Sequence, residues 1–476
     1  MIERVLQRSN LLHAKDHVQH NQGCPGVDLM PVNDLSELLL IDQQELIVKV
    51  SLGKYLPQPI LGVFIPKSNG KKRLLGIPTA IDRLLQQAVS QVITARFEFE
   101  FTAYSFGFRP RKNLHQAVQQ SQRYINEGYQ DIIDIDLKSF FDEVGHRLLL
   151  QLLYRKIKCK ETLRLIRKWL RAPILINGEL VKRRKGVPQG SPLSPLLSNI
   201  MLHELDREME RQGLKYVRYA DDFSIYCKSK QEARRVGNSL FIFLRDKLRL
   251  PINREKSGIR RPSTLTILGF SFVPTYMKGE KGQYQIVVSK ESWKKFKQKL
   301  KAITRKTTPI SFEERVRRLL EVQRGWVNHY RMANIYGKLK DLDSWIRNRL
   351  RYCIWHHWKK SERKRKNLIR LGIDQGQAYA WSRTRMGGWR VAQSPILGTT
   401  ITIERLKRRG YLTMLDIYKK IAPQLNEPLY TRPARLVLSE DEGYSGVRGV
   451  LRYLWMAEPS TRLYTVFLFR YLGENR

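Results

Sequence analysis

The sequence predicts a protein of the α+β class, in which a mainly antiparallel sheet with covering helices is followed by a helical region. Two observations lead to this prediction. Short runs rich in Ile, Val, Tyr and Phe, which favour strands, recur between turn residues as far as Phe272. From Trp293 onward, apolar residues recur instead at the three- and four-residue spacing of amphipathic helices. At 476 residues the chain is too long for one ordinary core, so we expect roughly two to four domains.

The charge of the chain points to a polyanionic partner. Lys and Arg number 87 against 44 Asp and Glu, a formal net charge of +43 that is spread over the sequence. Nucleic acid is the leading candidate and an anionic membrane is the rival. No run approaches the ~18 consecutive apolar residues of a membrane span, and the N-terminus lacks the apolar core of a signal peptide. Four widely separated cysteines without a CxxC pair argue against a zinc ribbon and fit the reducing cytoplasm.

Two cation-bearing segments follow a helical N-terminal region. In Ile65–Thr79, two β-prone runs bracket a Ser-Asn-Gly turn with several Lys and Arg residues. This pattern predicts either a solvated hairpin or a hairpin that covers phosphates. Tyr104–Asn113 is an aromatic, Gly-containing loop that carries Arg109, Arg111 and Lys112. Such a loop suits base stacking and phosphate contact, but equally a packed turn.

An acidic strand comes next. Ile132–Leu137 is strongly β-prone, and Asp134 and Asp136 within it share one face because successive side chains alternate. Helical sequence runs from His146 to about Leu170, and a β-prone pair lies near residues 174–178. The Pro- and Gly-rich stretch GVPQGSPLSP then predicts an extended turn that enters a buried helix.

The stretch Tyr216–Cys227 predicts a hairpin with Asp221 and Asp222 at its tip. A turn can bring both carboxylates toward one centre, where hard divalent ions such as Mg²⁺ bind carboxylate oxygens. The alternative is a surface Asp-Asp turn. A helix is expected from Glu232 to Leu248, followed by a segment that contains Lys256.

The helical region contains three apolar stripes, which predict packing between helices. Its outer faces are basic, and such cations contact phosphate backbones without conveying sequence information. We expect these cations to bind nucleic acid: Arg347, Arg351, Lys359, Lys360, Arg363, Lys364, Arg365 and Lys366.

Several motifs in this order resemble the reverse transcriptases encoded by bacterial group II introns, of the type without a His-Asn-His endonuclease. The motifs are N-x-G-x-x-G-V-D from Asn21, IPK-x-x-G-x-x-R-x-LGIPT, GFRP, the acidic strand, GVPQGSPLSP, YADD, LGF and GWVNHY. The resemblance covers residues 15 to about 430. It implies a right-hand polymerase with fingers and palm, a helical thumb and a small C-terminal DNA-binding region. The expected domains are an N-terminal extension (1–56), fingers and palm (57–285), thumb or maturase-specific domain X (286–385), DNA-binding region (386–438) and a tail without family counterpart (439–476).

The resemblance also implies roles for individual residues. The metal-binding Asp of the family lies five residues before an aromatic pocket residue, which selects Asp136 and Phe141. Asp136, Asp221 and Asp222 would then hold two Mg²⁺ ions, and Phe141 would crowd a 2′-hydroxyl. The resemblance further implies that Lys67 and Arg73 contact the triphosphate, that Gln189 and Gly190 line the nucleotide pocket, that Lys256 lies near the triphosphate, and that Arg109, Arg111 and Lys112 grip the template.

The implied function is an RNA-directed DNA polymerase of a group II intron, which copies intron RNA into DNA during retrohoming and assists splicing as a maturase. Its partners would be the intron RNA in a ribonucleoprotein, a DNA target with its primer, and dNTPs, in the bacterial cytoplasm. Without an endonuclease, the primer would come from elsewhere, for instance a nascent strand at a replication fork. Two alternatives remain open: a splicing maturase without a polymerase role, and a domesticated reverse transcriptase in defence or repair.

Overall fold

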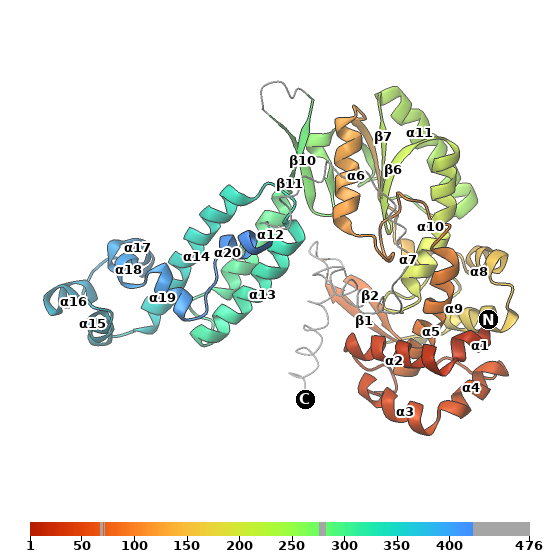
Figure 1. The fold of residues 1–476 in the computed structure, drawn as a ribbon, viewed down its shortest axis with the longest axis horizontal. Coiled ribbons are helices and arrows are strands. Elements are labelled where there is room, and N and C mark those ends of the chain that lie inside the picture. Colours follow the sequence, from red (N-terminus) through yellow and green to blue (C-terminus); the bar gives the residue numbers. More distant parts are fainter. Residues whose placement is uncertain (67–69, 71, 276–281, 422–476) are drawn as a thin grey trace, which may run out of the picture. The chain divides into compact units, whose positions relative to one another are not determined.

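The computed structural model describes residues 1–66, 70, 72–275 and 282–421, which divide into two compact units. The first unit comprises residues 1–265 and the second residues 266–421 (Figure 1). Both contain helices and strands, and helices dominate the second, so the predicted α+β class is confirmed. Lys67, part of the predicted DNA-binding region and the whole tail from residue 439 lie outside the described residues.

The N-terminal segment packs onto the long helix α5 (Ala80–Phe97). Val5 and Leu11 share the core of the first unit with Leu84, and all three side chains are fully buried. The Asn10 amide donates to the carbonyl of Ala88 at 3.1 Å. The helices of this segment are α1 (Ile2–Leu6), α2 (Arg8–His20), α3 (Leu35–Ile41) and α4 (Gln43–Ser51). The N-terminal segment is therefore continuous with the core of the first unit.

A four-stranded sheet of order β2-β1-β4-β5 contains the predicted cationic hairpin. β1 and β2 are antiparallel and close at the pair Pro66 and Lys72. β4 lies parallel to β1, and the turn to β5 uses positive φ angles of 50° at Asn177 and 90° at Gly178, as hairpin turns of the primed types require. The strands are β1 (Ile60–Pro66), β2 (Lys72–Ile77), β4 (Ile174–Ile176) and β5 (Glu179–Val181).

The buried carboxylate of Asp82 joins this sheet region to α9. Its oxygens accept hydrogen bonds from Tyr55 Oη (2.8 Å), Trp169 Nε1 (2.8 Å) and Thr79 Oγ1 (2.9 Å). Burial raises the pKa of Asp82, and the three donors act in the opposite direction. Because Tyr55 and Trp169 belong to segments other than α5, whereas Thr79 caps α5 itself, Asp82 joins α5 to two neighbouring segments.

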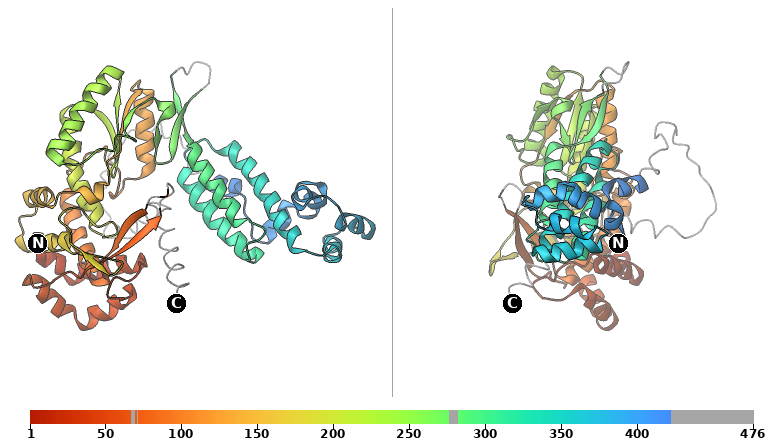
Figure 2. Two further views of the ribbon diagram at one scale, coloured as in Figure 1. Left: turned by 180° about the vertical axis from the view of Figure 1, so that it is seen from behind. Right: turned by 90° about the vertical axis from the view of Figure 1, so that its left-hand side faces the viewer.

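A second four-stranded sheet, of order β6-β7-β3-β8 and called the palm sheet below, carries the predicted acidic residues. Helix α6 covers one face and α11 the other (Figures 1 and 2). Its strands are β3 (Asp131–Ile135), β6 (Lys215–Tyr219), β7 (Asp222–Cys227) and β8 (Gly258–Arg260). The helices of this region are α6 (Leu114–Asn126), α7 (Phe140–Glu143), α10 (Ser194–Arg211) and α11 (Lys230–Phe243).

Two predicted helices differ from the observed ones. The helical sequence after His146 forms two helices, α8 (His146–Lys156) and α9 (Lys160–Arg171), because Ile157 leaves the helical conformation at ψ 78° and turns its side chain fully into the core. The helix expected to reach Leu248 ends at Phe243 as α-helix and continues as one π-helical turn, Leu244–Leu248. In that wider turn Leu244 and Leu248 both point inward.

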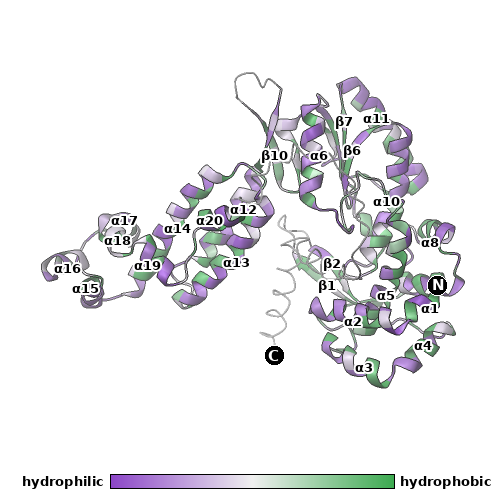
Figure 3. Ribbon diagram, in the orientation of Figure 1, coloured by the Kyte–Doolittle hydropathy of each residue, from purple (hydrophilic) through white to green (hydrophobic). Residues whose placement is uncertain are grey.

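The second unit is a set of helices preceded by a three-stranded sheet. The rings of Phe296 and Trp326 stack at 4.1 Å between centroids, and Trp293 lies 4.6 Å from Trp326. The aromatic stripe therefore packs helices together, as predicted. Hydrophilic and hydrophobic residues alternate along these helices (Figure 3). No helix in the described part of the chain is long and apolar enough to cross a membrane.

The elements of the second unit follow the chain in a simple order. Its strands are β9 (Thr266–Ile267), β10 (Phe270–Pro274) and β11 (Tyr284–Val288). Its longer helices are α12 (Lys290–Ile303), α13 (Phe312–Tyr330), α14 (Tyr336–His357) and α15 (Ser361–Arg370). Five short helices complete it: α16 (Gln375–Ser382), α17 (Gly388–Gln393), α18 (Pro395–Thr400), α19 (Ile403–Arg408) and α20 (Met414–Ile421).

Candidate functional site

The predicted acidic strand and YADD hairpin lie side by side in the palm sheet. β3 pairs with β7 in antiparallel register as far as Ile135 and Phe223. Continuing this register by one residue places Asp136 opposite Asp222, the first residue of β7. Asp221 lies in the adjoining turn between β6 and β7. The backbone thus brings the three predicted carboxylates to one edge of one sheet.

The backbone around Asp136 is held by a loop that follows α11. Asn253 Nδ2 donates to the Asp136 carboxylate at 2.8 Å, and the Asp136 amide donates to Ser257 Oγ at 3.0 Å. Lys256 Nζ lies 3.4 Å from the same carboxylate, and the lysine side chain is 63% exposed. Lys256 thus lies beside Asp136, and its role near the triphosphate stays a prediction. Sequence reasoning missed Asn253 and Ser257, which position the acid.

The second acid of β3, Asp134, has a different environment. Arg260 Nε donates to its carboxylate at 2.8 Å. Burial raises the pKa of Asp134, while the arginine acts to lower it. Each acid thus has a cation beside it, Arg260 at Asp134 and Lys256 at Asp136. The selection of Asp136 as the ligand stays a prediction from the family resemblance.

The donor chemistry of this edge suits Mg²⁺, since hard divalent cations take carboxylate oxygens. Asp136 directly follows β3, Asp222 begins the neighbouring strand β7, and Asp221 adjoins it. Within the described ranges, however, no three His, Cys, Asp or Glu side chains are grouped closely enough to hold a metal ion as they stand. Residue type and register therefore fit the ion, whereas the side-chain arrangement is not that of a formed metal site.

The predicted nucleotide-pocket residues are brought together by the GVPQG stretch. Arg73 Nε donates to Gln189 Oε1, and the Gly76 amide donates to the Gln189 carbonyl at 2.8 Å. The Val187 amide donates to the carbonyl of Phe141 at 2.7 Å. One extended segment therefore links β2 of the cationic hairpin to the helix that carries Phe141.

Gly190 is required by this close packing. Its φ is 126°, and a Cβ atom placed on it would lie 2.4 Å from the carbonyl oxygen of Gly76. A side chain at position 190 would separate the GVPQG stretch from β2, which explains why glycine occupies it.

The aromatic loop departs from its predicted role at Arg109. The Arg109 side chain is only 6% exposed, and its guanidinium donates to Glu98 Oε1 at 2.8 Å and to the Ser105 carbonyl at 2.9 Å, as well as to the Thr102 carbonyl. It therefore holds the loop from inside and is turned away from any nucleic acid. Of its neighbours, Arg111 is exposed, and Lys112 donates to the Ala103 carbonyl at 3.1 Å.

The predicted cations of the second unit also separate into two groups. Arg351 points inward and donates to the carbonyls of Ile401 (3.0 Å) and Gly398 (3.2 Å), contrary to the sequence-based expectation. Arg347 is half-buried. Lys364 lies over the Trp355 ring at 4.5 Å, and Arg365 pairs with Glu362 at 2.7 Å. The exposed members are Lys359, Lys360, Arg363 and Lys366, called the α15 cation cluster below.

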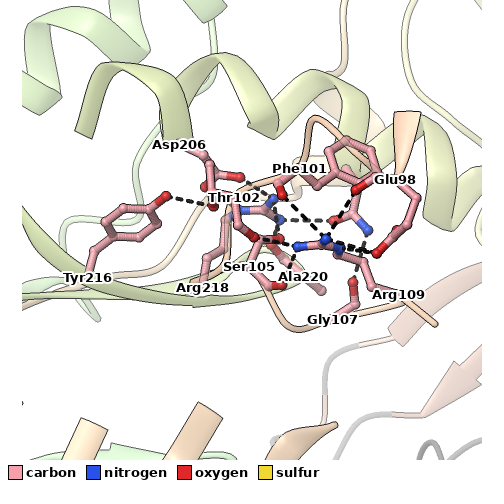
Figure 4. Close-up of polar contacts among 11 residues, drawn as sticks. Glu98, Phe101, Thr102, Ser105, Gly107, Arg109, Asp206, Tyr216, Arg218 and Ala220 are labelled. Atoms are coloured by element: carbon pink, nitrogen blue, oxygen red, sulfur yellow. Dashed lines mark hydrogen bonds and ion pairs between the residues drawn. The ribbon is translucent and has the colours of Figure 1, made fainter. Parts of the chain in front are cut away.

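One pair that sequence reasoning missed lies beneath the YADD turn. Arg218 and Asp206 are both completely buried and form a two-pronged ion pair, with Nε to Oδ1 at 2.7 Å and Nη2 to Oδ2 at 2.5 Å (Figure 4). Arg218 lies two residues after Tyr216 on one strand, so it shares the face of a residue that is fully buried.

Comparison with known proteins agrees with this arrangement. Residues 65–272 match the reverse transcriptase (RNA-dependent DNA polymerase) family, and residues 293–372 match the group II intron maturase-specific domain. Protein YkfC of Escherichia coli is 32% identical over 273 residues, which cover 49% of this chain and 72% of YkfC. The chain belongs to the group II intron reverse transcriptase/maturase family.

Other relatives are matched over a smaller share of their length. The group II intron-encoded protein LtrA of Lactococcus lactis is 32% identical over 285 residues, 46% of this chain, and the chain spans 47% of the length of LtrA. Among solved structures, a partial Cas6-RT-Cas1–Cas2 complex is 26% identical, with a TM-score of 0.33, and the match covers 52% of this chain and 42% of that chain. In this chain the match to the reverse transcriptase family precedes the match to the maturase-specific domain.

Proposed function

We propose that this protein is the RNA-directed DNA polymerase of a group II intron, and that it copies intron RNA into DNA during retrohoming. The observation that carries the proposal is the convergence of Asp136 with the Asp221–Asp222 turn at one edge of the palm sheet. The order of the two family domains supports the assignment.

In this proposal, Asp136, Asp221 and Asp222 hold two Mg²⁺ ions. Such ions make the primer 3′-hydroxyl a better nucleophile and stabilise charge on the transferring phosphorus. The residues of the chain do the rest. Arg73, oriented by its hydrogen bond to Gln189, compensates the charge of the triphosphate together with Lys67. Lys256, which lies beside Asp136, is the proposed proton donor to the leaving pyrophosphate.

The test is primer extension on a generic RNA template with Mg²⁺ and dNTPs, comparing wild type with Asp221→Ala/Asp222→Ala at equal RNA occupancy. We expect extension by the wild type alone. The matched control, Glu161→Ala/Asp246→Ala, removes the same two charges from exposed positions of the first unit and is expected to extend normally. If neither the wild type nor the double Asp variant extends while both bind RNA, the polymerase proposal is refuted.

Phe141 determines sugar selection in this proposal. The GVPQG stretch binds its backbone, and its ring meets Phe140 edge-on at 5.3 Å, so the side chain is held in place. Phe141→Ala is expected to raise incorporation of ribonucleotides at least tenfold relative to deoxyribonucleotides, a discrimination of about 1.4 kcal/mol. Single-nucleotide incorporation kinetics with dNTP and rNTP measure the ratio, and an unchanged ratio contradicts the assignment.

A second role, as a maturase that assists splicing of intron RNA, is favoured by the domain at residues 293–372 and by the exposed α15 cation cluster within it. Intron RNA and a DNA target would be its partners. The test is self-splicing of the folded intron at low Mg²⁺, with and without protein. Splicing help that persists in Asp221→Ala/Asp222→Ala would separate the two roles, and no acceleration by the wild type would exclude this one.

A further inference from the structure

The turn that carries Asp221 and Asp222 has a strained backbone. Ala220, which precedes both acids, has φ 58°, in the left-handed region that non-glycine residues seldom adopt. Such a conformation persists only where surrounding contacts enforce it. Arg218 supplies one of them, because its Nη1 donates to the Ala220 carbonyl at 2.9 Å.

The Arg218 guanidinium makes further hydrogen bonds to three other side chains. Nη2 donates to Ser105 Oγ at 2.7 Å and to Asp206, and Nη1 also donates to Asn199 Oδ1 at 3.0 Å. The Arg218 side chain is completely buried, so these bonds form away from solvent. Burying two charges costs free energy that an ion pair rarely exceeds, and a packed apolar pair would stabilise the fold at least as well. The pair is therefore better explained by the geometry it imposes than by stability.

The aromatic loop is part of the same structure. The Phe106 amide donates to the Arg218 carbonyl at 2.8 Å, and Asn199 Nδ2 donates to the Gly107 carbonyl at 2.9 Å. A Cβ atom on Gly107 would lie 2.3 Å from the Ala220 amide nitrogen. The loop and the turn thus touch backbone to backbone, and Figure 4 shows Arg218 between them.

We propose that Arg218, oriented by Asp206, is a positioning residue that fixes the Asp221–Asp222 turn and couples it to the loop Tyr104–Gly107. This inference rests on the proposed polymerase function. Arg218 touches neither substrate nor metal ligands directly in this scheme. It acts through the Ala220 carbonyl, and the loop acts through Gly107.

Arg218→Lys tests the positioning role. Lysine keeps the charge beside Asp206 but lacks the fork that reaches Asp206, Ser105, Asn199 and Ala220 together. We expect single-turnover nucleotide incorporation to fall about 100-fold, since a displacement of about 1 Å at a reacting centre has that effect. The KM for dNTP and the Kd for RNA should stay within about twofold. Arg83→Lys is the matched control, because Arg83 is also buried and donates to a carbonyl, that of Cys24.

Gly107→Ala tests the coupling from the opposite side. Its Cβ displaces the turn, so the rate should fall by a similar factor with RNA affinity unchanged. If loop and Arg218 act as one unit, Arg218→Lys/Gly107→Ala is no slower than the slower single variant. Rate losses that multiply would show independent action and overturn the coupling.

Active-site titration separates positioning from simple loss of folded enzyme. A structural role lowers the titrated fraction, whereas a positioning role lowers the rate per titrated site. Should Arg218→Lys fail to fold, Ser105→Ala, which removes one acceptor, is expected to lower the rate per site several-fold. An unchanged rate per site in Arg218→Lys, or in Ser105→Ala if the lysine variant is lost, overturns the proposal. An inactive wild type instead refutes the polymerase function on which it rests.

Discussion

The aromatic loop of the first unit and helix α15 of the second are both rich in Lys and Arg, but they differ in how far those side chains are exposed to solvent. Arg109 of the loop is 6% exposed and donates to protein carbonyls, whereas the α15 cation cluster lies on the surface. From the sequence, the cations of both segments were predicted to bind nucleic acid. The structure shows that Arg109 is bonded inside the protein, whereas Arg111 of the same loop and the α15 cation cluster are exposed.

This difference in exposure depends on which groups donate hydrogen bonds to the backbone carbonyls of each segment. Inside a helix each carbonyl accepts from the amide four residues on, so the side chains need not supply donors. The loop has no such regular ladder of backbone hydrogen bonds, and the guanidinium of Arg109 donates to the carbonyls of both Thr102 and Ser105. Arg109 of the loop therefore points inward, whereas the α15 cation cluster stays on the surface.

The same pattern recurs at the ends of helices in both units. Arg183 donates to the carbonyls of Leu170 and Ala172 after α9, and Arg315 to those of Ile303 and Arg305 after α12. The last carbonyls of a helix have no donor within the helix, so, like the loop carbonyls, they require a donor from elsewhere. An arginine whose guanidinium donates to such carbonyls is thus a poor candidate for nucleic-acid contact.

The largest expected effect is the loss of stability on removing the buried cation Arg109. Arg109→Ala leaves Glu98 and several carbonyls without their donor, so we expect a loss of about 3–5 kcal/mol in the free energy of unfolding. Urea denaturation measures it. Arg111→Ala, in the same loop but exposed, is the control and should change stability by less than about 0.5 kcal/mol. Equal losses in the two variants would remove the distinction between inward and outward cations.

Neutralising the outward cations should affect binding and leave stability unchanged. The quadruple variant Lys359→Gln/Lys360→Gln/Arg363→Gln/Lys366→Gln should keep its Tm, because none of the four is buried. The slope of log Kd for RNA against log salt should fall by up to about 3, since each phosphate contact contributes about 0.7.

Fluorescence anisotropy across a salt series measures this slope. Arg317→Gln is the control, because Arg317 is exposed but already paired with Glu314 and Glu321. Its change in slope should be smaller than that of any one member of the α15 cation cluster. A quadruple variant with an unchanged slope would show that this cluster does not meet phosphates.

The smallest expected effect concerns His146, a buried side chain that also donates to a carbonyl but, unlike arginine, changes its charge near neutral pH. The buried ring of His146 donates to the Gly186 carbonyl at 2.7 Å, and burial lowers its pKa from 6.5, against the effect of that hydrogen bond. The unfolded chain therefore binds a proton more readily below about pH 6.5, and the free energy of unfolding should fall as pH decreases through that range.

His146→Gln keeps an N–H donor but does not titrate, so its unfolding free energy should decline less between pH 7.5 and 5.5 than that of the wild type. Thermal unfolding at several pH values measures the difference. A steeper decline in the glutamine variant would contradict the sign, since the other lowered histidines, His17 and His203, are common to both proteins.

Much of the site follows from short-range patterns. The strand with Asp136, the hairpin with Asp221 and Asp222, and the three apolar stripes of the second unit were all predictable, because alternation and helical spacing depend on neighbouring residues. Residue types at the acidic edge also predicted hard-metal chemistry. The continuation of β3 and β7 in one register confirms that the two acidic segments belong together.

The direction of the arginines could not be predicted in the same way. Arg109 and Arg351 were expected on nucleic acid, and each is bonded instead to carbonyls of other segments. The break between α8 and α9 likewise depends on a core position for Ile157 that its own sequence does not specify.

The sequence by itself determined which segments are strands and helices, where the carboxylates lie and to which family the chain belongs, since each of these depends on local spacing and residue type. Only the tertiary structure decided that Arg218 and Asp206 lie buried beneath the turn and that Gly107 meets Ala220. Gly107 and Ala220 are about a hundred positions apart in the chain, and Arg218 and Asp206, although only 12 positions apart, belong to different elements. Both contacts depend on which carbonyls and charges the fold removes from water.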